Sequence, residues 1–471
     1  MNRRDFLRST SAGGLVTATT LCSLKAFAAG DMPRKRPRLG TPGIGYGALR
    51  RTADQDGQEI LALPEGFRYV TFGRTGERMS DGSNTPRSHD GMGCFGMPGG
   101  LIRLIRNHEI VNPAGNFDLA VMGSAATRYD ALGGGGCVSI DFDPFRMQPV
   151  RDFVSLNGTV VNCSGGLAYR DAGWLTCEET VRGTAQGFAK PHGYAFFVGR
   201  DWDGPREAQP IVAMGRFVRE AAVADATGTV YQTEDAGGDS GFYRFLPNDP
   251  ANLASGGKLQ MLAVKGRPNY DTRTDQAVDT DLAVEWVAID DPDPAAISAT
   301  TSCFAQGFAK GGARFNRLEG IYRGDDDSIF FVSTSGGNAA YGQLWQYIPS
   351  RTGSATLVLR FESPSGTVLD SPDNLCVTPS GGILFCEDDA SPKDNDRHPL
   401  APEIVNVNRL IGLAREGEIF EFAVNVFNNS EFAGACFSPK GEILFVNIFG
   451  YGAVGSGMTC AITGPWRRGP L

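Results

Sequence analysis

The stretch Ile383-Leu-Phe-Cys-Glu-Asp388 joins a short apolar strand to two acidic residues, and the chain repeats this pattern. Four other stretches also consist of an apolar strand and a polar tip: Trp174-Leu-Thr-Cys-Glu-Glu179, Val230-Tyr-Gln-Thr-Glu-Asp235, Ile329-Phe-Phe-Val-Ser-Thr334 and Ile443-Leu-Phe-Val-Asn-Ile448. Each follows an earlier short strand and a turn, and four of the five precede a third strand. Such a repeated strand unit is typical of a radial β fold.

The number of units predicts the architecture. With a further unit around Leu101 to Glu109 the chain has about six, so we expect an all-β fold, a six-bladed β-propeller. The last unit lacks a third strand of its own in this reading, and the N-terminal strand Phe67 to Phe72 is predicted to supply it and close the ring. A β-sandwich with similar hairpins is the alternative, which the regular spacing disfavours. The 62 glycines and 27 prolines are spread along the chain as turn residues.

The N-terminus has the features of an export signal. Arg3 and Arg4 precede Phe6-Leu7, a modest apolar stretch follows, and Ala26-Phe-Ala28 forms a small-residue cleavage site. We therefore predict a twin-arginine signal peptide at 1–28, an extended leader at 29–62 and a single propeller domain at 63–471. The predicted location is periplasmic or secreted, with the twin-arginine translocation machinery as a partner during export. No apolar run reaches the length of about 20 residues that a membrane helix needs.

Charge and cysteine content narrow the possible partners. The formal charge is −9 for the whole chain and −12 without residues 1–28, which makes nucleic acid a poor partner. Nine cysteines remain after Cys22 leaves with the signal. Because nine is odd, either one thiol stays free or one has another role, such as binding a metal. We expect a monomer that acts on small molecules.

The acidic tips are predicted to converge at one end of the propeller. In an antiparallel pair, the start of the first strand and the end of the second lie at the same edge. Crowded carboxylates repel one another, so such a ring is expected to hold cations, above all Ca²⁺. Cys163 lies in a turn and is a candidate thiolate ligand for a transition metal such as iron, although a buried structural cysteine is the alternative.

A candidate phosphate-binding group lies at the start of another unit. Arg317 and Glu319 flank Leu318, so both face the same way in an extended segment. A guanidinium beside a metal-binding carboxylate suits phosphoryl transfer, whereas a surface ion pair is the simpler interpretation. In Arg106-Asn-His-Glu109, we expect Glu109 to be a metal ligand and Asn107 or His108 to be an orienting group, with Asn107 as the candidate that binds the substrate.

Several of these motifs together resemble the PhoX alkaline phosphatases. The motifs occur in consistent order along nearly the whole mature chain: Arg106-Asn-His-Glu109, Asn162-Cys-Ser-Gly-Gly166, Trp174-Leu-Thr-Cys-Glu-Glu179, His192-Gly-Tyr194, Thr233-Glu-Asp235, Arg317-Leu-Glu-Gly320 and Pro372-Asp-Asn-Leu375. The resemblance implies an exported propeller that hydrolyses phosphate monoesters with Fe³⁺ and Ca²⁺. It implies that Cys163 binds iron and that Arg317 holds the substrate phosphate.

The resemblance also implies a set of carboxylate ligands. They are Glu109, Glu178, Glu234, Glu319 and Glu387. Glu179, Asp235, Asp373 and Asp388 are less firmly placed, and of these four Asp373 and Asp388 are included among the candidate metal ligands. We therefore expect a metal-dependent phosphomonoesterase with Arg317 as its catalytic residue and phosphate esters as its substrates. Two alternatives stay open: a non-catalytic, calcium-stabilised propeller that binds a partner protein, and a calcium-dependent lactonase.

Overall fold

The computed structural model describes residues 38–39, 45–350, 354–389 and 395–471. These residues form an all-β fold with one short α-helix, α2 (Cys303–Ala309), so the predicted all-β class is confirmed. None of their helices has the length and apolar character needed to span a membrane. The predicted signal peptide, residues 1–28, lies outside the described residues.

Most strands of the described residues belong to six antiparallel meanders. The first three are β5 (His89–Gly96), β6 (Ile102–His108), β7 (Gly135–Asp143) and β8 (Gln148–Thr159); β9 (Asn162–Leu167), β10 (Gly173–Glu178) and β11 (Ala195–Gly199); and β12 (Arg219–Ala224), β13 (Val230–Glu234), β14 (Phe242–Pro247) and β15 (Gly257–Val264). The last three are β17 (Leu318–Arg323), β18 (Ile329–Ser333), β19 (Gln343–Ile348) and β20 (Thr356–Glu362); β21 (Pro372–Val377), β22 (Ile383–Glu387), β23 (Arg409–Leu413) and β24 (Glu418–Asn425); and β25 (Phe432–Phe437), β26 (Ile443–Ile448) and β27 (Met458–Thr463).

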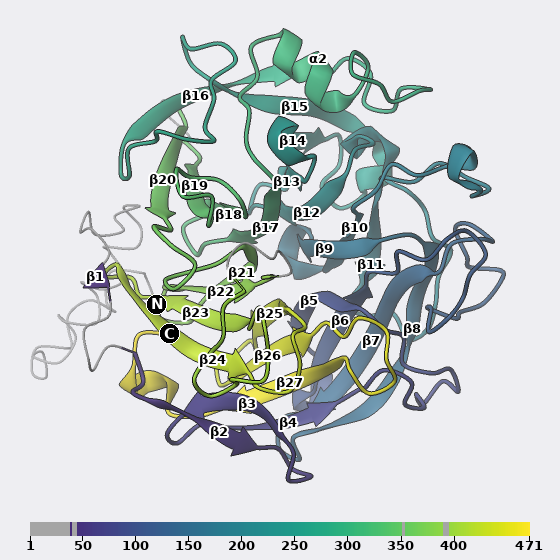
Figure 1. Ribbon diagram of the computed structural model, residues 1–471. Helices are drawn as coiled ribbons and strands as arrows, with labels where there is room; N and C mark the ends of the chain where they lie inside the picture. Colours follow the sequence, from purple (N-terminus) through teal and green to yellow (C-terminus); the bar gives the residue numbers. More distant parts are fainter. Residues whose placement is uncertain (1–37, 40–44, 351–353, 390–394) are drawn as a thin grey trace, which may run out of the picture.

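The first strands of the meanders form a closed ring. In Figure 1, β5, β9, β12, β17, β21 and β25 surround the centre of the molecule. Each contacts the next, and β25 contacts β5. The arrangement is therefore propeller-like, and we refer to these six as the inner strands.

Apolar clusters fill the spaces between neighbouring meanders. Phe331 packs with Phe242 of the preceding meander, whereas its neighbour Phe330 lies in the cluster shared with Phe385 of the following one. Similar clusters join the other neighbouring pairs. Because both faces of each sheet are covered, the second strands β18, β22 and β26 begin with continuous apolar runs. The repeated pattern in the sequence follows from this burial.

The N-terminal strands complete the fold, with two differences from the prediction. β4 (Arg68–Phe72) pairs with β27, so this N-terminal strand does join the last meander, but β27 already supplies the third strand, and β4 is the fourth. In addition, the segment 29–62 is not all an extended leader. β2 (Leu49–Ala53) and β3 (Glu59–Pro64) form a hairpin on β24, and β1 (Arg38–Leu39) also pairs with β24, because the outer edge of that meander offers unpaired backbone groups.

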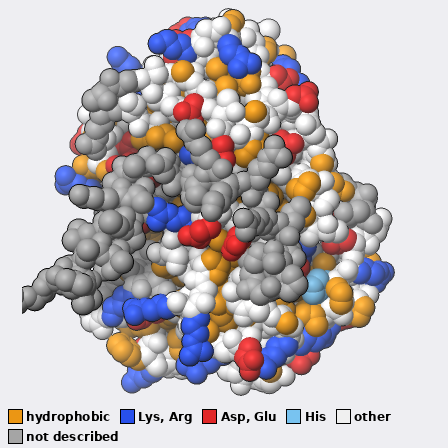
Figure 2. Space-filling view, turned by 90° about the vertical axis from the view of Figure 1, so that its left-hand side faces the viewer, with side chains coloured by type: hydrophobic (Ala, Val, Ile, Leu, Met, Phe, Trp, Pro, Cys, Tyr) orange, Lys and Arg blue, Asp and Glu red, His pale blue; other side chains and the backbone are white. Residues whose placement is uncertain are grey.

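Two further features lie at the surface. β16 (Asp281–Ala288) pairs with β15 and with β20 and so links the third and fourth meanders at their outer edges. On the side of the molecule shown in Figure 2, acidic and basic side chains are interspersed.

Every cysteine among the described residues is a free thiol.

Candidate metal centre

The inner strands place a metal-binding type of side chain at the same position in five of the six described meanders. The second residue of each inner strand is Asp90, Cys163, Glu220, Glu319 or Asp373, whereas β25 has Ala433. A β-bulge interrupts the pairing of every inner strand at or beside this residue. A bulge locally changes the direction of the side chains. The repeated bulge therefore directs these residues to one end of the fold.

The backbone before four of these residues is strained. Ser88, Val161, Arg317 and Ser371 lie two positions before Asp90, Cys163, Glu319 and Asp373, and their φ angles are 56°, 53°, 44° and 43°. Residues other than glycine rarely adopt such angles, and those that do cluster at functional sites. The strain is repeated where the chain turns into the inner strand, so it belongs to the construction of this end of the fold.

A second set of acidic residues follows the second strands directly. Glu109, Glu179, Asp235 and Asp388 occupy this position in four meanders, and Thr334 and Phe449 occupy it in the other two. In all six, the backbone N–H of this residue donates to a carbonyl just before the inner strand, at 2.8 to 3.2 Å. This repeated hydrogen bond holds each tip beside the start of its inner strand. We call the two sets together the carboxylate ring.

The carboxylate ring brings possible ligand atoms close together. Three groups have their ligand atoms within 4.8 Å of one another: Cys163 with Glu179 and Glu220; Glu179 with Asp235 and Glu319; and Glu220 with Glu319 and Asp373. Glu179, Glu220 and Glu319 each belong to two groups, so the groups are contiguous. One thiol and five carboxylates thus form a single compact donor set.

Burial and mutual repulsion raise the pKa values in the ring. For Glu220 and Glu319, burial is the largest cause, and the nearby Asp373 and Asp235 carboxylates add to it. The pKa of Asp373 rises to about 7, again mainly through burial. Burial and neighbouring carboxylates also raise the pKa values of Asp90, Glu109, Glu179 and Glu431. The site is therefore short of positive charge.

Unsatisfied oxygen atoms indicate where cations fit. Neither carboxylate oxygen of Glu220, nor Oδ1 of Asp90, receives a conventional hydrogen bond from the described residues. The Cys163 thiol lies close to both side chains and lowers their pKa, but less than burial raises it. Buried carboxylate oxygens without donors are costly unless they are paired or coordinate a metal. The donors present, carboxylate oxygens and one thiol, fit Ca²⁺ and iron.

Arg317 supplies a guanidinium at the edge of the ring. Its Nη2 donates to Asp235 Oδ2 at 2.9 Å and to Glu319 Oε1 at 2.8 Å, and its side chain is 45% exposed. The two carboxylates fix its position, while the exposed part can be reached from solvent. Such a group can bind a substrate phosphate beside the metal ligands.

Comparison with known proteins establishes the family. A family model described as alkaline phosphatase PhoX matches residues 44–452. The chain belongs to the PhoX alkaline phosphatase family. It is therefore a metal-dependent phosphomonoesterase, as the sequence motifs predicted, and not a non-catalytic propeller. No curated protein matches the sequence significantly.

Solved structures give weaker similarities. A gluconolactonase from Xanthomonas campestris, XC5397, has a TM-score of 0.43 at 10% identity and covers 92% of this chain and 100% of its own. A periplasmic gluconolactonase from Pseudomonas aeruginosa has a TM-score of 0.37 at 14% identity and covers 88% and 96%. A luciferin-regenerating enzyme has a TM-score of 0.43 at 10% identity and covers 80% and 92%. These similarities bear on neither the site nor the reaction of this chain.

The structure places Glu178, Glu234 and Glu387 away from the three ligand groups of the ring. Each is the last residue of its second strand, so its side chain points opposite to that of the next acidic residue. Glu178 accepts hydrogen bonds from His192 Nδ1, Gly193 N and Val160 N; Glu234 from Tyr243 Oη and Gly241 N; and Glu387 from Arg409 and Asp370 N. Their oxygens are therefore occupied by these hydrogen-bond donors. The structure thus favours Glu179, Asp235 and Asp388 as the ring members.

The Glu178→Gln and Glu179→Gln variants are expected to behave differently. Glu178 is fully buried and lies 2.6 Å from His192, so its loss breaks a buried pair and costs about 3 kcal/mol of stability, with metal content unchanged. Glu179→Gln removes a ring oxygen and is expected to lower metal content. Chemical unfolding and elemental analysis of both variants measure this difference. Loss of metal from Glu178→Gln at unchanged stability would contradict the placement.

Asn107 holds the backbone of Cys163 in place and is buried away from substrate. Its Nδ2 donates to Cys163 O at 2.9 Å and to Ser164 O at 2.7 Å. Its Oδ1 accepts from Trp174 Nε1 at 3.0 Å and from the Cys137 thiol at 3.2 Å. With these partners the side chain has no free group for a phosphate. The structure therefore favours a positioning role over the predicted substrate contact.

Sequence reasoning missed Asp90 and Glu220 because it aligned the tips instead of the inner strands. Both precede a small residue, as Cys163 and Glu319 do. The reason is steric, since a Cβ at Gly91 would lie 2.6 Å from Ser164 Cα, and one at Gly320 would lie 2.7 Å from Asp373 O. An acidic residue before a small one at the start of the first strand is the signal that could have found them.

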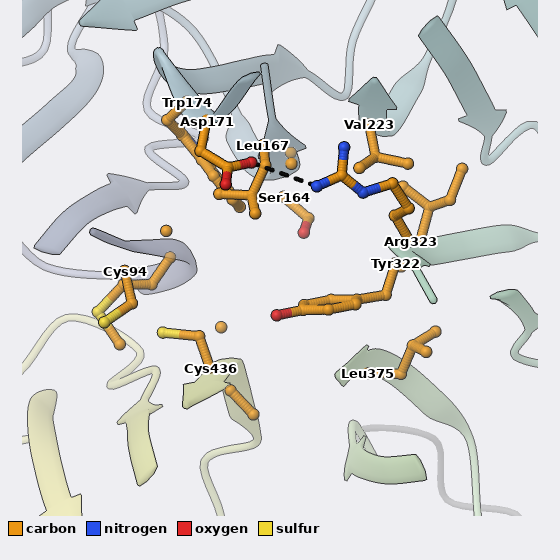
Figure 3. A pocket seen from close by; sticks show the side chains of 18 of the residues that line it. Cys94, Ser164, Leu167, Asp171, Trp174, Val223, Tyr322, Arg323, Leu375 and Cys436 are labelled. Atoms are coloured by element: carbon orange, nitrogen blue, oxygen red, sulfur yellow. Dashed lines mark hydrogen bonds and ion pairs between the residues drawn. The ribbon is translucent and has the colours of Figure 1, made fainter. Parts of the chain in front are cut away.

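A separate cavity of about 480 Å³ lies along the axis of the molecule. Later residues of the inner strands line it, including Cys94, Tyr322, Arg323 and Cys436, whose side chains are shown in Figure 3. Arg323 pairs there with Asp171 at 3.3 Å. None of the carboxylate-ring side chains lines this cavity, so it is distinct from the candidate metal centre.

Proposed function

We propose that this protein hydrolyses phosphate monoesters outside the cytoplasm, at an iron and calcium cluster held by the carboxylate ring of a six-bladed β-propeller. The observation that carries the proposal is the compact donor set of one thiol and several carboxylates beside the half-exposed guanidinium of Arg317. Six meanders whose inner strands form a closed ring support the blade count. The twin arginine and the Ala-x-Ala site support the location.

The donor types suggest how the two metals divide among the ligands. Cys163 would bind iron, because a thiolate suits a transition metal, and Glu179 and Glu220 have ligand atoms within 4.8 Å of the thiol. Glu319, Asp373 and Asp235 would hold calcium through oxygen alone. Asp90, Glu109, Asp388 and Glu431 form a further acidic group that surrounds Asp373. When bound, the metals would neutralise phosphate oxygens and lower the pKa of the attacking oxygen.

The chain itself contributes position and charge. Arg317 is held by Asp235 and Glu319, so little side-chain freedom is lost when it takes up a phosphate oxygen. The burial of the ring lowers the local dielectric constant, which strengthens the interaction of the guanidinium with charge that develops in the transition state. Purified protein analysed for iron and calcium, and assayed for phosphate release, tests the proposal. Protein that contains both metals and releases no phosphate would refute it.

The variant Arg317→Lys is expected to lower kcat/KM for phosphate esters by about a hundredfold. Lysine keeps the charge but cannot contact Asp235, Glu319 and a phosphate oxygen in one planar arrangement. Loss of one preorganised donor to developing charge typically costs about 10² to 10³ in rate. Steady-state kinetics with metal content measured in parallel would separate this effect from loss of ligands. A rate close to that of the unmodified protein would remove Arg317 from the reaction.

A further inference from the structure

A second pocket lies at the same end of the fold as the carboxylate ring. Its volume is about 440 Å³, and Val218, Glu234 and Ala236 form its inner wall. Val218 O accepts the hydrogen bond from Asp235 N, and Asp235 lies between Glu234 and Ala236 in the chain. The pocket therefore lies beside the backbone of Asp235, a member of the carboxylate ring. Helix α2 closes the opposite side, and we call this cavity the α2 pocket.

The walls of the α2 pocket are largely apolar. Phe304, Ala305 and Phe308 of α2 face it, together with Ile297 from the preceding loop and Val181. The Phe304 and Phe308 rings stack with their centroids 5.3 Å apart. Pockets of this size with mostly apolar walls and a few polar groups are typical of small-molecule sites. The walls suit an aromatic ring or a short alkyl chain.

Arg314 provides a polar group in the same pocket. It bonds Asp239 at 3.1 Å, and its guanidinium lies 4.7 Å from the centre of the Phe308 ring. Its buried Nε has no acceptor among the described residues. The Arg314 guanidinium therefore places one positive charge at the wall of the pocket.

A short turn connects the pocket to the phosphate-binding arginine. The backbone N–H of Arg317 donates to Gly237 O at 2.8 Å. Gly237 begins the 3₁₀ turn η5 (Gly237–Asp239), and Asp239 at the end of this turn is the ion-pair partner of Arg314. The backbone of Arg317 therefore lies one short turn away from the wall of the α2 pocket.

We propose that the α2 pocket binds the alcohol part of the substrate, so that phosphate monoesters of apolar alcohols, aryl or longer alkyl, are preferred. This inference rests on the proposed function, and it adds the substrate class. The apolar walls, the nearness of Asp235 and the connection through η5 to Arg317 all support it.

The test compares two esters with similar leaving groups, ethyl phosphate and 3-phenylpropyl phosphate. Because both release a primary alcohol, a difference in kcat/KM reports binding of the apolar group. The metal-loaded full chain is expected to prefer the phenylpropyl ester by about tenfold or more, since even one buried methylene can contribute about that much. Ala299→Trp, which fills the pocket from its exposed loop, is expected to remove the preference and to leave ethyl phosphate within about twofold.

Ala295→Trp is the matched control. Ala295 is exposed in the same loop and does not line the pocket, so both rates should stay unchanged. Calorimetric binding of the two corresponding phosphonates gives a readout that needs no catalysis. Tighter binding of the phenylpropyl phosphonate that Ala299→Trp abolishes supports the pocket, even if neither ester is hydrolysed and the proposed function fails. Equal kcat/KM for both esters, or a preference that survives in Ala299→Trp, would overturn the inference while the phosphatase function stands.

Discussion

Removal of the metals with a chelator is expected to abolish phosphate release and to lower the unfolding temperature of the protein. The ring places Glu220, Glu319 and Asp373 within 4.8 Å of one another in a buried site, with Arg317 as the cation bonded to it. Without bound cations, these carboxylates must take up protons or repel one another, as their raised pKa values indicate. The ring joins residues from five meanders, so its repulsion opposes closure of the whole fold.

The expected loss of unfolding free energy on removal of a cation follows from mass action. A cation present at a thousandfold excess over its Kd contributes about 4 kcal/mol to the free energy of unfolding. Thermal unfolding of metal-loaded and chelated protein, followed by addition of Ca²⁺ or Mg²⁺, measures the effect. We expect Ca²⁺ to restore the unfolding temperature and Mg²⁺ to restore little, because Mg²⁺ demands regular octahedral geometry and dehydrates reluctantly. An unchanged unfolding temperature after chelation would show that the ring holds no stabilising cation.

Cys163→Ala is expected to remove most of the iron and to lower the rate of phosphate release by more than about a hundredfold. Substitution of groups that merely support a metal ligand already costs about 10- to 100-fold, and Cys163 is the one thiol in the ligand groups of the described residues. Burial, followed by the nearby Asp90 and Glu220 carboxylates, raises the pKa of the Cys163 thiol well above its usual value. A bound cation reverses this effect, because a coordinated thiol is deprotonated.

Cys94→Ala is the matched control for this prediction. Cys94 lines the axial cavity and belongs to none of the ligand groups, so its loss should leave iron content and rate unchanged. Elemental analysis and steady-state kinetics of both variants complete the experiment. Iron content and activity that survive in Cys163→Ala would exclude the thiolate ligand and leave a centre of oxygen ligands alone.

Neighbouring acidic residues show where prediction from sequence was limited. The pairs Glu178-Glu179, Glu234-Asp235 and Glu387-Asp388 are visible as strand tips, but the side chains within a pair point in opposite directions. A shift of one residue at the strand end exchanges the two roles. The hydrogen bonds of Glu178 to His192 and of Glu387 to Arg409 show that these two side chains point away from the ring. Both partners lie on later segments of the same meander.

Four features could be found from the sequence alone: the repeated strand pattern, the acidic tips, Cys163, and the pair of Arg317 and Glu319. They are local features, because each meander must bury two faces of its second strand and must end in a polar turn. The tertiary structure was needed for three other features. They are the convergence of Cys163, Glu179 and Glu220, the role of Asn107 and the position of the α2 pocket. Bulges redirect the side chains there, and packing between meanders joins residues far apart in the chain, which no local spacing records.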